Sequence, residues 1–412
     1  MKNHFAILLL GALLLASGCS ESKMPLPSPA SLSTAFGAND TSYVELYPIW
    51  DSAYLGVNLQ APGDLTISAD GTLFLADEAA NHIYALSQAG RLLTGFGSNG
   101  LEAIAKPCGL AMDSKLNLLI VNGTPQLFIW NQYLNRVTLD SVADTGIYYD
   151  RVKNETLQLT FAELRQRVAE GGSMPTLRRF LFRKDPERIA AARQIYPAYQ
   201  ADAGSQFNGV AAGKFGAETV YVTESNFDRI VQLVLVPNLA LKGTDRTVLF
   251  QYIALFQKTI AVYGSGSGTV DNPWAITTDS DENIYFTQLG GNFRVQKLTA
   301  NVFTPRYVLY QHAIMDLERF AAPYDVTLDG SNNIFVLDGG TGSVSKFANT
   351  GVKAGQLLSL GQKGLALAKF NQGRGLLVSE DVVYVVERDT KSIRRFQYSI
   401  SESDIPDDEK KP

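Results

Sequence analysis

The chain has 412 residues, a formal net charge of −5 and 45% hydrophobic residues. An acidic chain lacks the basic face that neutralises phosphates, so composition excludes a general nucleic-acid binder, and we expect no nucleic-acid partner. The two cysteines, Cys19 and Cys108, cannot build a disulfide framework. The hydrophobic content is ample for a large core, and closed β architectures of this length can form one domain.

The first 19 residues have the features of a targeting segment. Lys2 gives a positive start, and Phe5 to Leu15 form an apolar stretch too short to span a bilayer as a mature helix. The sequence Leu15-Ala-Ser-Gly-Cys19 resembles the bacterial lipobox, a signal that is cut before a cysteine carrying acyl chains. The resemblance implies a lipoprotein that is acylated on Cys19 and anchored in the cell envelope. Ser20 after the cysteine favours the outer membrane of a Gram-negative bacterium; the alternative is an ordinary secretory signal with an incidental cysteine.

Two segments flank the expected folded part, which we place at residues 43–400. Residues 20–42 are rich in Pro and Ser and show no periodicity, which predicts a flexible tether. Residues 401–412 are highly charged, which predicts a solvated and disordered tail.

Six copies of one pattern follow each other from about residue 61 to residue 398. In each copy a turn residue precedes a first strand, a polar hairpin follows, and a second apolar strand ends on an acid or an amide. We call these six end residues the outer ring. They are Asp77, Asn122, Glu224, Gln288, Asp338 and Glu387. Since every copy has a hydrogen-bonding side chain there, we expect the outer ring to be structural, with a cation site from neighbouring carboxylates as the alternative.

Together with glycine-rich links between copies, the pattern resembles the NHL repeat, a β-propeller blade. The resemblance implies an all-β fold, a six-bladed β-propeller whose radial blades leave only short edges. The stretch from Tyr43 to Trp50 is strand-like and precedes the first copy. We therefore predict that it pairs with the last copy as its outer strand and closes the ring.

One segment, at about residues 145–205, breaks the pattern and predicts a small helical insertion between blades two and three. A capping box at Thr160 and Glu163 opens one helix, which ends at Gly171, and Asp185 caps a second one that runs to about Tyr196. Residues 151–200 contain ten Lys or Arg against five acids. The insertion is either a solvated excursion packed on the rim or a lid or docking surface for an anionic partner or phospholipid headgroups.

The residues that start the first strands differ from copy to copy, and we call them the inner ring. They are Gly63, Cys108, Asn208, Trp274, Tyr324 and Arg374, with Asp64 and Asp325 following in two copies. Positions with the same architectural role should be alike, so this inequality predicts a specific ligand pocket on the axis. Aromatic faces at Trp274 and Tyr324 and an anion clamp at Arg374 suit a ligand. The alternative is that these residues face a water-filled channel, contact only water, and vary between copies because they bind no ligand.

Enzyme signatures are sparse. His82 and His312 are the histidines left after the targeting segment, and two scattered histidines cannot form a three-histidine zinc centre. A calcium site of the kind found in lactonase-like propellers would need oxygen ligands on the axis, to which Asp64, Asn208 and Asp325 could contribute. We expect Cys108 to be structural rather than nucleophilic.

We therefore expect no catalytic residue and a lipid-anchored propeller that binds a small molecule or a protein through its axial face. The alternatives are a cation-dependent hydrolase or lyase, and a purely structural envelope protein.

Overall fold

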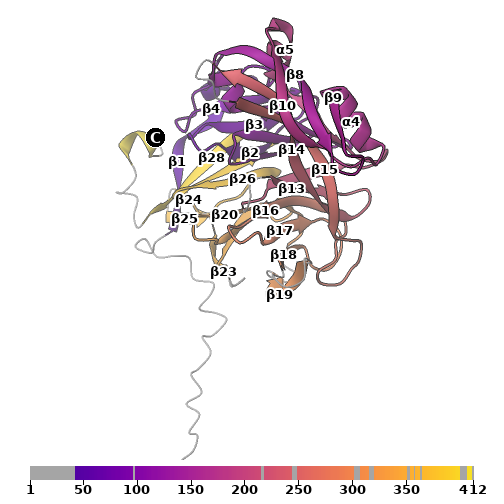
Figure 1. The fold of residues 1–412 in the computed structure, drawn as a ribbon. Coiled ribbons are helices and arrows are strands. Elements are labelled where there is room, and N and C mark those ends of the chain that lie inside the picture. The colour runs from indigo at the N-terminus through magenta and orange to yellow at the C-terminus, as the bar shows by residue number, and fades with distance from the viewer. Residues whose placement is uncertain are drawn as a thin grey trace, which may run out of the picture.

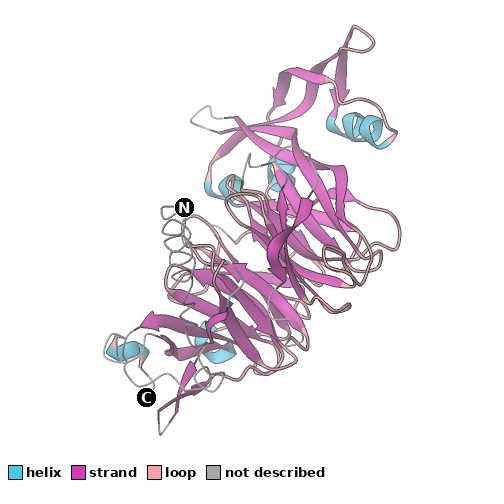
Figure 2. Cartoon of the chain, turned by 90° about the horizontal axis from the view of Figure 1, so that it is seen from below, coloured by secondary structure: helices cyan, strands magenta, loops and turns pink. Residues whose placement is uncertain are grey.

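The structure is a computed structural model. It describes residues 42–95, 98–214, 218–243, 248–300, 307–314, 320–349, 353–356, 358–361, 364–399 and 406–410. The predicted targeting segment with Cys19, and the predicted tether except Ser42, lie outside the described residues. The described chain is mostly β-strand, arranged in separate antiparallel sheets with a few short helices (Figures 1 and 2). None of the helices in these ranges has the length and apolar character needed to cross a membrane.

Each copy of the repeat forms three consecutive strands of its own sheet. In chain order these are β2 (Pro62–Ile67), β3 (Leu73–Asp77) and β4 (His82–Leu86); β5 (Gly109–Met112), β6 (Asn117–Val121) and β7 (Gln126–Asn131); β12 (Phe207–Ala212), β13 (Thr219–Glu224) and β14 (Arg229–Gly243); β16 (Pro273–Thr278), β17 (Ile284–Gln288) and β18 (Val295–Ala300); β20 (Pro323–Leu328), β21 (Ile334–Asp338) and β22 (Ser343–Phe347); and β26 (Gly373–Ser379), β27 (Val382–Glu387) and β28 (Ser392–Ser399). The second strands are buried on both faces, which explains why they are continuous apolar runs.

Five of the six sheets have a fourth, outer strand among the described residues. In sheet order these strands are β11 (Tyr196–Gln200), β15 (Val248–Ala261), β19 (Tyr307–Ile314), β23 (Lys353–Gln356) and β1 (Ser42–Asp51). The pairing of β1 with β28 joins the N-terminal strand to the last sheet, as predicted. A hairpin of β24 (Leu358–Gly361) and β25 (Gly364–Leu367) follows β23, and the helix α2 (Ser52–Leu55) follows β1.

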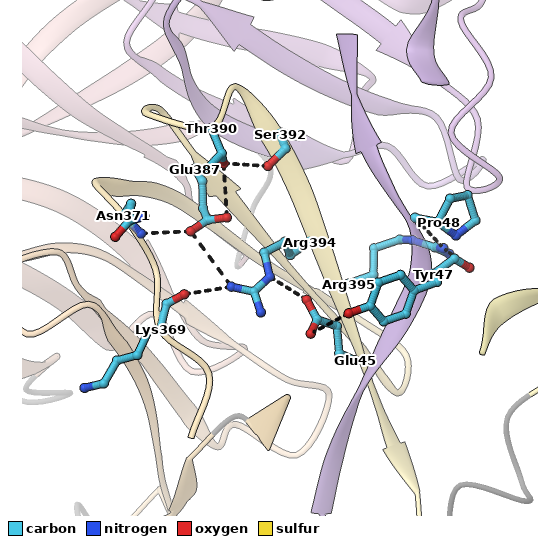
Figure 3. Close-up of polar contacts among 10 residues, drawn as sticks. All are labelled: Glu45, Tyr47, Pro48, Lys369, Asn371, Glu387, Thr390, Ser392, Arg394 and Arg395. Carbon is cyan, nitrogen blue, oxygen red and sulfur yellow. Dashed lines mark hydrogen bonds and ion pairs between the residues drawn. The ribbon is translucent and has the colours of Figure 1, made fainter. Parts of the chain in front are cut away.

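A buried polar network fastens β1 to the last sheet (Figure 3). Arg394 Nε donates to Glu45 Oε1 at 2.5 Å, and Arg394 Nη1 lies 3.9 Å from Glu387 Oε1. Glu45 and Glu387 are only 2% and 3% exposed. One guanidinium therefore compensates two buried carboxylates, one from each end of the folded chain.

The hydrophobic core is divided into layers that lie between successive sheets. Alternate residues of a strand point to opposite faces, so Ile334 and Val336 pack towards the fourth sheet while Phe335 and Leu337 pack towards the sixth. Comparable clusters fill the first-to-second, second-to-third, third-to-fourth and sixth-to-first interfaces. The first strands also contact one another in a cycle, from β2 through β5, β12, β16, β20 and β26 back to β2. The arrangement is propeller-like.

The insertion differs from the prediction in place and in content. Since β11 pairs with β7, the extra residues lie inside the second sheet, between its third and fourth strands. The predicted helices are present but short, as α4 (Phe161–Ala169), which starts with the capping box, and α5 (Pro186–Ala192). The segment contains more strand than helix, with β8 (Leu139–Asp150), β9 (Glu155–Thr160) and β10 (Thr176–Arg183). Figure 1 shows these elements together at one edge, beside β14 and β15.

The strands of the insertion were not predicted, because the capping signals at Thr160 and Asp185 predicted helices there; β8 and β9 form a local hairpin, and only the pairing with β14 comes from a distant part of the chain. β8 pairs with β10, with β9 and with the end of β14, and so extends the third sheet. The short helix α3 (Gln132–Arg136) leads from β7 into this unit, and Leu134 shares a core with Phe161 and Ala192. Within the predicted tail, Asp407–Glu409 form a 3-10 turn, η3, and Glu409 accepts a hydrogen bond from Arg395 at 2.8 Å.

Candidate functional site

A cavity of about 500 Å³ lies among the first strands of all six sheets. All seven residues predicted to bind a ligand line it: Asp64, Cys108, Asn208, Trp274, Tyr324, Asp325 and Arg374. They share the same place in the repeat, at the start of a first strand, and the first strands form the cycle of contacts. The structure therefore brings these residues together, and their role in binding stays a prediction.

Trp274, Tyr324 and Arg374 form an aromatic and cationic side of this axial cavity. The rings of Trp274 and Tyr324 meet edge to face with centroids 5.8 Å apart, and the guanidinium carbon of Arg374 lies 3.7 Å from the Tyr324 centroid. Burial lowers the pKa of Arg374, but a guanidinium remains charged in proteins. Its Nε is buried and has no hydrogen-bond partner among the described residues. A stacked guanidinium held in one plane suits a carboxylate, which accepts two parallel N–H bonds.

An ion pair near Arg374 was not predicted from the sequence. Arg388 Nη2 lies 2.6 Å from Glu78 Oε2 and joins the sixth sheet to the first. Arg388 lowers the pKa of Arg374 and Glu78 raises it, so both charges act on the cavity. The signal was available, since Glu78 and Arg388 directly follow two members of the outer ring.

Asp64 and Asp325 occupy equivalent positions in the first and fifth sheets and make equivalent bonds. Oδ1 of each accepts the N–H of the next residue at 2.7 Å. Oδ2 accepts an N–H from the neighbouring first strand at 2.6 Å, from Leu110 for Asp64 and from Leu376 for Asp325. Burial raises the pKa of Asp64 to about 7, and burial together with the charge of Asp64 raises the pKa of Asp325. Each carboxylate therefore links two sheets and retains its proton more readily than an exposed acid.

The same two carboxylates are the candidates for an axial cation. With the amide of Asn208 they are the ligands that the sequence suggested, and hard cations prefer such oxygen ligands. Their oxygens already accept backbone N–H bonds, which hold them against the strands. In the part of the chain that the structure describes, no three His, Cys, Asp or Glu residues form a group suited to a metal ion.

Cys108 and Asn208 lie where the second and third sheets approach most closely. Cys108 Sγ is 3.5 Å from the carbonyl oxygen of Val121 and 3.8 Å from that of Asn208. Burial raises the pKa of Cys108 to about 12, so its thiol is protonated at neutral pH and is a poor nucleophile. A Cβ atom on Gly109 would lie 2.5 Å from the carbonyl oxygen of Asn208, which explains the glycine.

The opposite end of the cavity is polar and was also missed. Lys214, Asp279 and Asp329 line it, near the hairpins that end the first strands. In three of these hairpins an aspartate accepts the N–H and the amide of an asparagine four residues later, as Asp279 does from Asn283 at 2.9 and 2.7 Å and Asp113 does from Asn117, both at 2.8 Å. Asp329 and Asn333 repeat these bonds. The D-x-x-x-N spacing is a visible sequence signal, and its bonds shape the turns.

The outer ring lies beside the cavity but is occupied by internal bonds. Asp77 accepts N–H bonds from Gln60 and Ala61, both at 2.8 Å, and Asp338 accepts them from Ala321 and Ala322 at 2.9 and 2.8 Å. Asn122, Gln288 and Glu387 also bond the backbone 16 or 17 residues upstream, in the link before their own first strand. Glu224 instead pairs with Arg229.

Comparisons with known proteins give only distant structural likenesses. No protein-family model matches the chain, and no curated protein matches it. A streptogramin B lyase is 14% identical, with a TM-score of 0.47 over 86% of this chain and 98% of the other. A gluconolactonase from Xanthomonas campestris is 10% identical, with a TM-score of 0.49 over 87% of this chain and 98% of the other. The calcium-binding protein regucalcin from Agrobacterium tumefaciens is 12% identical, with a TM-score of 0.45 over 87% and 95%. Likenesses this distant carry no inference about activity.

Proposed function

We propose that the six sheets are the blades of a six-bladed, NHL-type β-propeller. The proposal is supported by the cycle of first-strand contacts and by an apolar layer at every interface between successive sheets. The pairing of β1 with β28 would close the ring, since it joins the two ends of the folded chain in one blade. The insertion then belongs to the second blade and adds strands to the third.

We infer that the propeller is a binding module whose site is the axial cavity. The observation that carries this proposal is that all seven unequal residues at the first-strand starts line one cavity of about 500 Å³. That volume is within the range of small-molecule sites, roughly 300–1,000 Å³. The stacked Arg374 and the rings of Trp274 and Tyr324 favour a ligand with a carboxylate and a flat apolar part.

Tryptophan fluorescence tests this proposal on the full chain. Trp50 and Trp130 are fully buried, whereas Trp274 lines the cavity, so a ligand there should change the emission of Trp274. We expect benzoate to quench the emission saturably and benzyl alcohol, which lacks the carboxylate, to have little effect. Arg374→Gln should weaken benzoate binding roughly tenfold or more, since it removes a charge-assisted bond.

Arg91→Gln is the matched control, because Arg91 is exposed and lies outside the cavity. Equal quenching by benzoate in the wild type and in Arg374→Gln would contradict a binding site built on Arg374.

The second candidate is a cation-dependent hydrolase or lyase with an axial metal site, for which calcium is the cation to test. It is favoured by one observation, that Asp64 and Asp325 are both buried in the axial cavity and interact electrostatically. A cation that binds only the folded protein would stabilise it, and the stabilisation grows as the cation concentration exceeds the dissociation constant. We expect calcium to leave the melting temperature of the full chain unchanged; a rise that disappears in Asp64→Asn would favour the enzyme.

We also propose that the chain is a lipoprotein of the cell envelope, attached through Cys19 to the outer membrane of a Gram-negative bacterium. This rests on the sequence from Leu15 to Cys19 and on Ser20. Expression in a Gram-negative host should place the wild type in the outer-membrane fraction. Cys19→Ala should prevent acylation, which mass spectrometry of the mature N-terminus measures directly. An unacylated wild-type N-terminus would refute this part of the proposal.

A further inference from the structure

The first sheet differs from the other five in its outer edge. Its third strand, β4, has no fourth strand beside it among the described residues. The link after β4 touches this edge at two points, where Leu93 N donates to Ala85 O at 2.8 Å and Ile83 N donates to Leu101 O at 3.2 Å. A cavity of about 510 Å³ lies beside the strand, and described residues of the link, among them Gly95 and Ser98, line it.

The walls of this second cavity are held by contacts from three parts of the chain. Trp130 of the second sheet donates from its ring nitrogen to the carbonyl oxygen of Asn99 at 2.7 Å. Gln194, just after α5 of the insertion, packs against Gly100. Gly100 has a φ of +80°, and a Cβ there would lie 2.6 Å from Gln194 Oε1, so only glycine fits. Residues of β4, of the link and of the insertion therefore line this cavity together, beside an edge that has no fourth strand in the described part of the chain.

The polar side chains on these walls are available to a ligand. His82, Tyr84, Asn99, Glu102 and Gln194 line the cavity. Among the described residues, none of these five side chains has a hydrogen-bond partner in the structure. His82 and Tyr84 are two apart on β4 and share a face, with ring centroids 4.5 Å apart. The axial cavity differs, since its two carboxylates are already bonded to backbone N–H groups.

The chemistry of these groups defines the class of ligand. Glu102 is an acceptor, the amides of Asn99 and Gln194 both donate and accept, and the Tyr84 ring, tilted by 43° to the His82 ring, offers an apolar face. The described residues of the lining include no Lys or Arg, so they provide no clamp for a phosphate or carboxylate. Burial lowers the pKa of His82, which leaves a neutral imidazole with one donor and one acceptor at neutral pH. Sugars combine an apolar C–H face with a rim of neutral hydroxyls. We propose that the cavity beside β4 is a saccharide-binding site, separate from the axial cavity.

Histidine NMR on the full chain tests the proposal with defined probes, namely methyl β-D-glucopyranoside, methyl β-D-galactopyranoside and N-acetyl-D-glucosamine. The chain has three histidines, so the His82 imidazole signal can be assigned with His82→Gln. We expect at least one probe to shift the His82 signal saturably at millimolar concentration. Glu102→Gln should weaken that probe roughly tenfold, because it replaces a charged acceptor by a neutral one.

Two control variants make the test specific. Glu155→Gln makes the same chemical change at an exposed position on β9 and should leave saccharide binding unchanged. Trp274→Ala alters the axial cavity and should also leave it unchanged, so this site and the axial site can fail independently. The proposal is overturned if no probe shifts His82, if Glu102→Gln binds like the wild type, or if Trp274→Ala abolishes binding.

Discussion

The outer and inner rings lie close together at the same end of the sheets, yet they differ in what their side chains do. Each outer-ring residue ends a second strand, and five of the six bond the backbone of the link before their own first strand. The inner-ring residues start the first strands and, except Gly63, line the axial cavity. The outer ring is alike in chemistry because every sheet has the same link to hold. The inner ring is unequal because its side chains face a shared cavity rather than a repeated backbone.

This difference gives a physical criterion that distinguishes structural residues from residues of the candidate binding site. A buried acid such as Asp77 is stable only because backbone N–H groups satisfy it, and the same kind of bond is accepted by Gln288, Asp338 and Glu387. Arg374, by contrast, keeps an unpaired buried Nε in the described structure. We therefore expect outer-ring changes to act on stability and inner-ring changes to act on binding.

The largest expected effect is at Arg394, where the outer ring meets the closing strand β1. Arg394→Met leaves Glu45 and Glu387 buried without their shared cation. Removing one partner of a buried pair costs about 3–5 kcal/mol of unfolding free energy. Urea denaturation measures the loss, with the exposed Arg91→Met as control. A loss of unfolding free energy no larger than that of the control would contradict a structural role for the outer ring.

A smaller loss is expected at Asp77. Asp77→Asn keeps the shape of the side chain but leaves fewer acceptors for the N–H groups of Gln60, Ala61 and Ala80. One or more N–H groups then lose their acceptor, which should cost about 1–3 kcal/mol. Thermal and urea unfolding measure it. Benzoate quenching of Trp274 should persist in the folded variant, and its loss at unchanged stability would place Asp77 with the site instead.

A pH-dependent effect is expected at Asp64, which is buried in the axial cavity but bonds the backbone as the outer ring does. Burial raises its pKa to about 7 in the folded protein from the ordinary value of 3.8, so the folded state binds more protons between these values. Asp64 therefore makes the wild type lose stability as pH rises from about 4 to 7. Asp64→Asn has no such proton, and its stability relative to the wild type should rise across that window. Melting temperatures at several pH values test this, and a constant difference would contradict it.

The smallest effect on stability is expected at Arg374. Arg374→Gln removes a partly buried cation that stacks on Tyr324 but neutralises no buried carboxylate in the described structure, so the free energy of unfolding should fall by about 0.5–1 kcal/mol. Benzoate binding should nevertheless weaken roughly tenfold or more. Unfolding and fluorescence on the same preparation make the comparison, and a large loss of stability would show that the inner ring is also part of the frame.

Much of the fold could be predicted from the sequence, because the six copies of the repeat can be aligned with one another. The six first and second strands, the two insertion helices and the pairing of the 43–50 stretch were predicted from apolar periodicity and turn residues. The insertion strands were not, although β8 and β9 form a local hairpin; the pairing of β8 with the end of β14 is a long-range contact that the local sequence pattern does not contain. For the same reason the insertion was placed between two sheets rather than inside the second one.

The candidate sites divide in the same way. The sequence by itself determined that seven unequal residues would gather at one place, since equal positions in a cyclic repeat must converge on its axis. Only the tertiary structure decided that Asp64 and Asp325 would be tied to neighbouring strands, because those N–H groups belong to other sheets. It also decided that Gln194 of the insertion would line a second cavity beside β4, where the described residues provide no fourth strand. The periodicity of the sequence predicts the strands that all copies share. Contacts between different copies depend on how the sheets pack against one another.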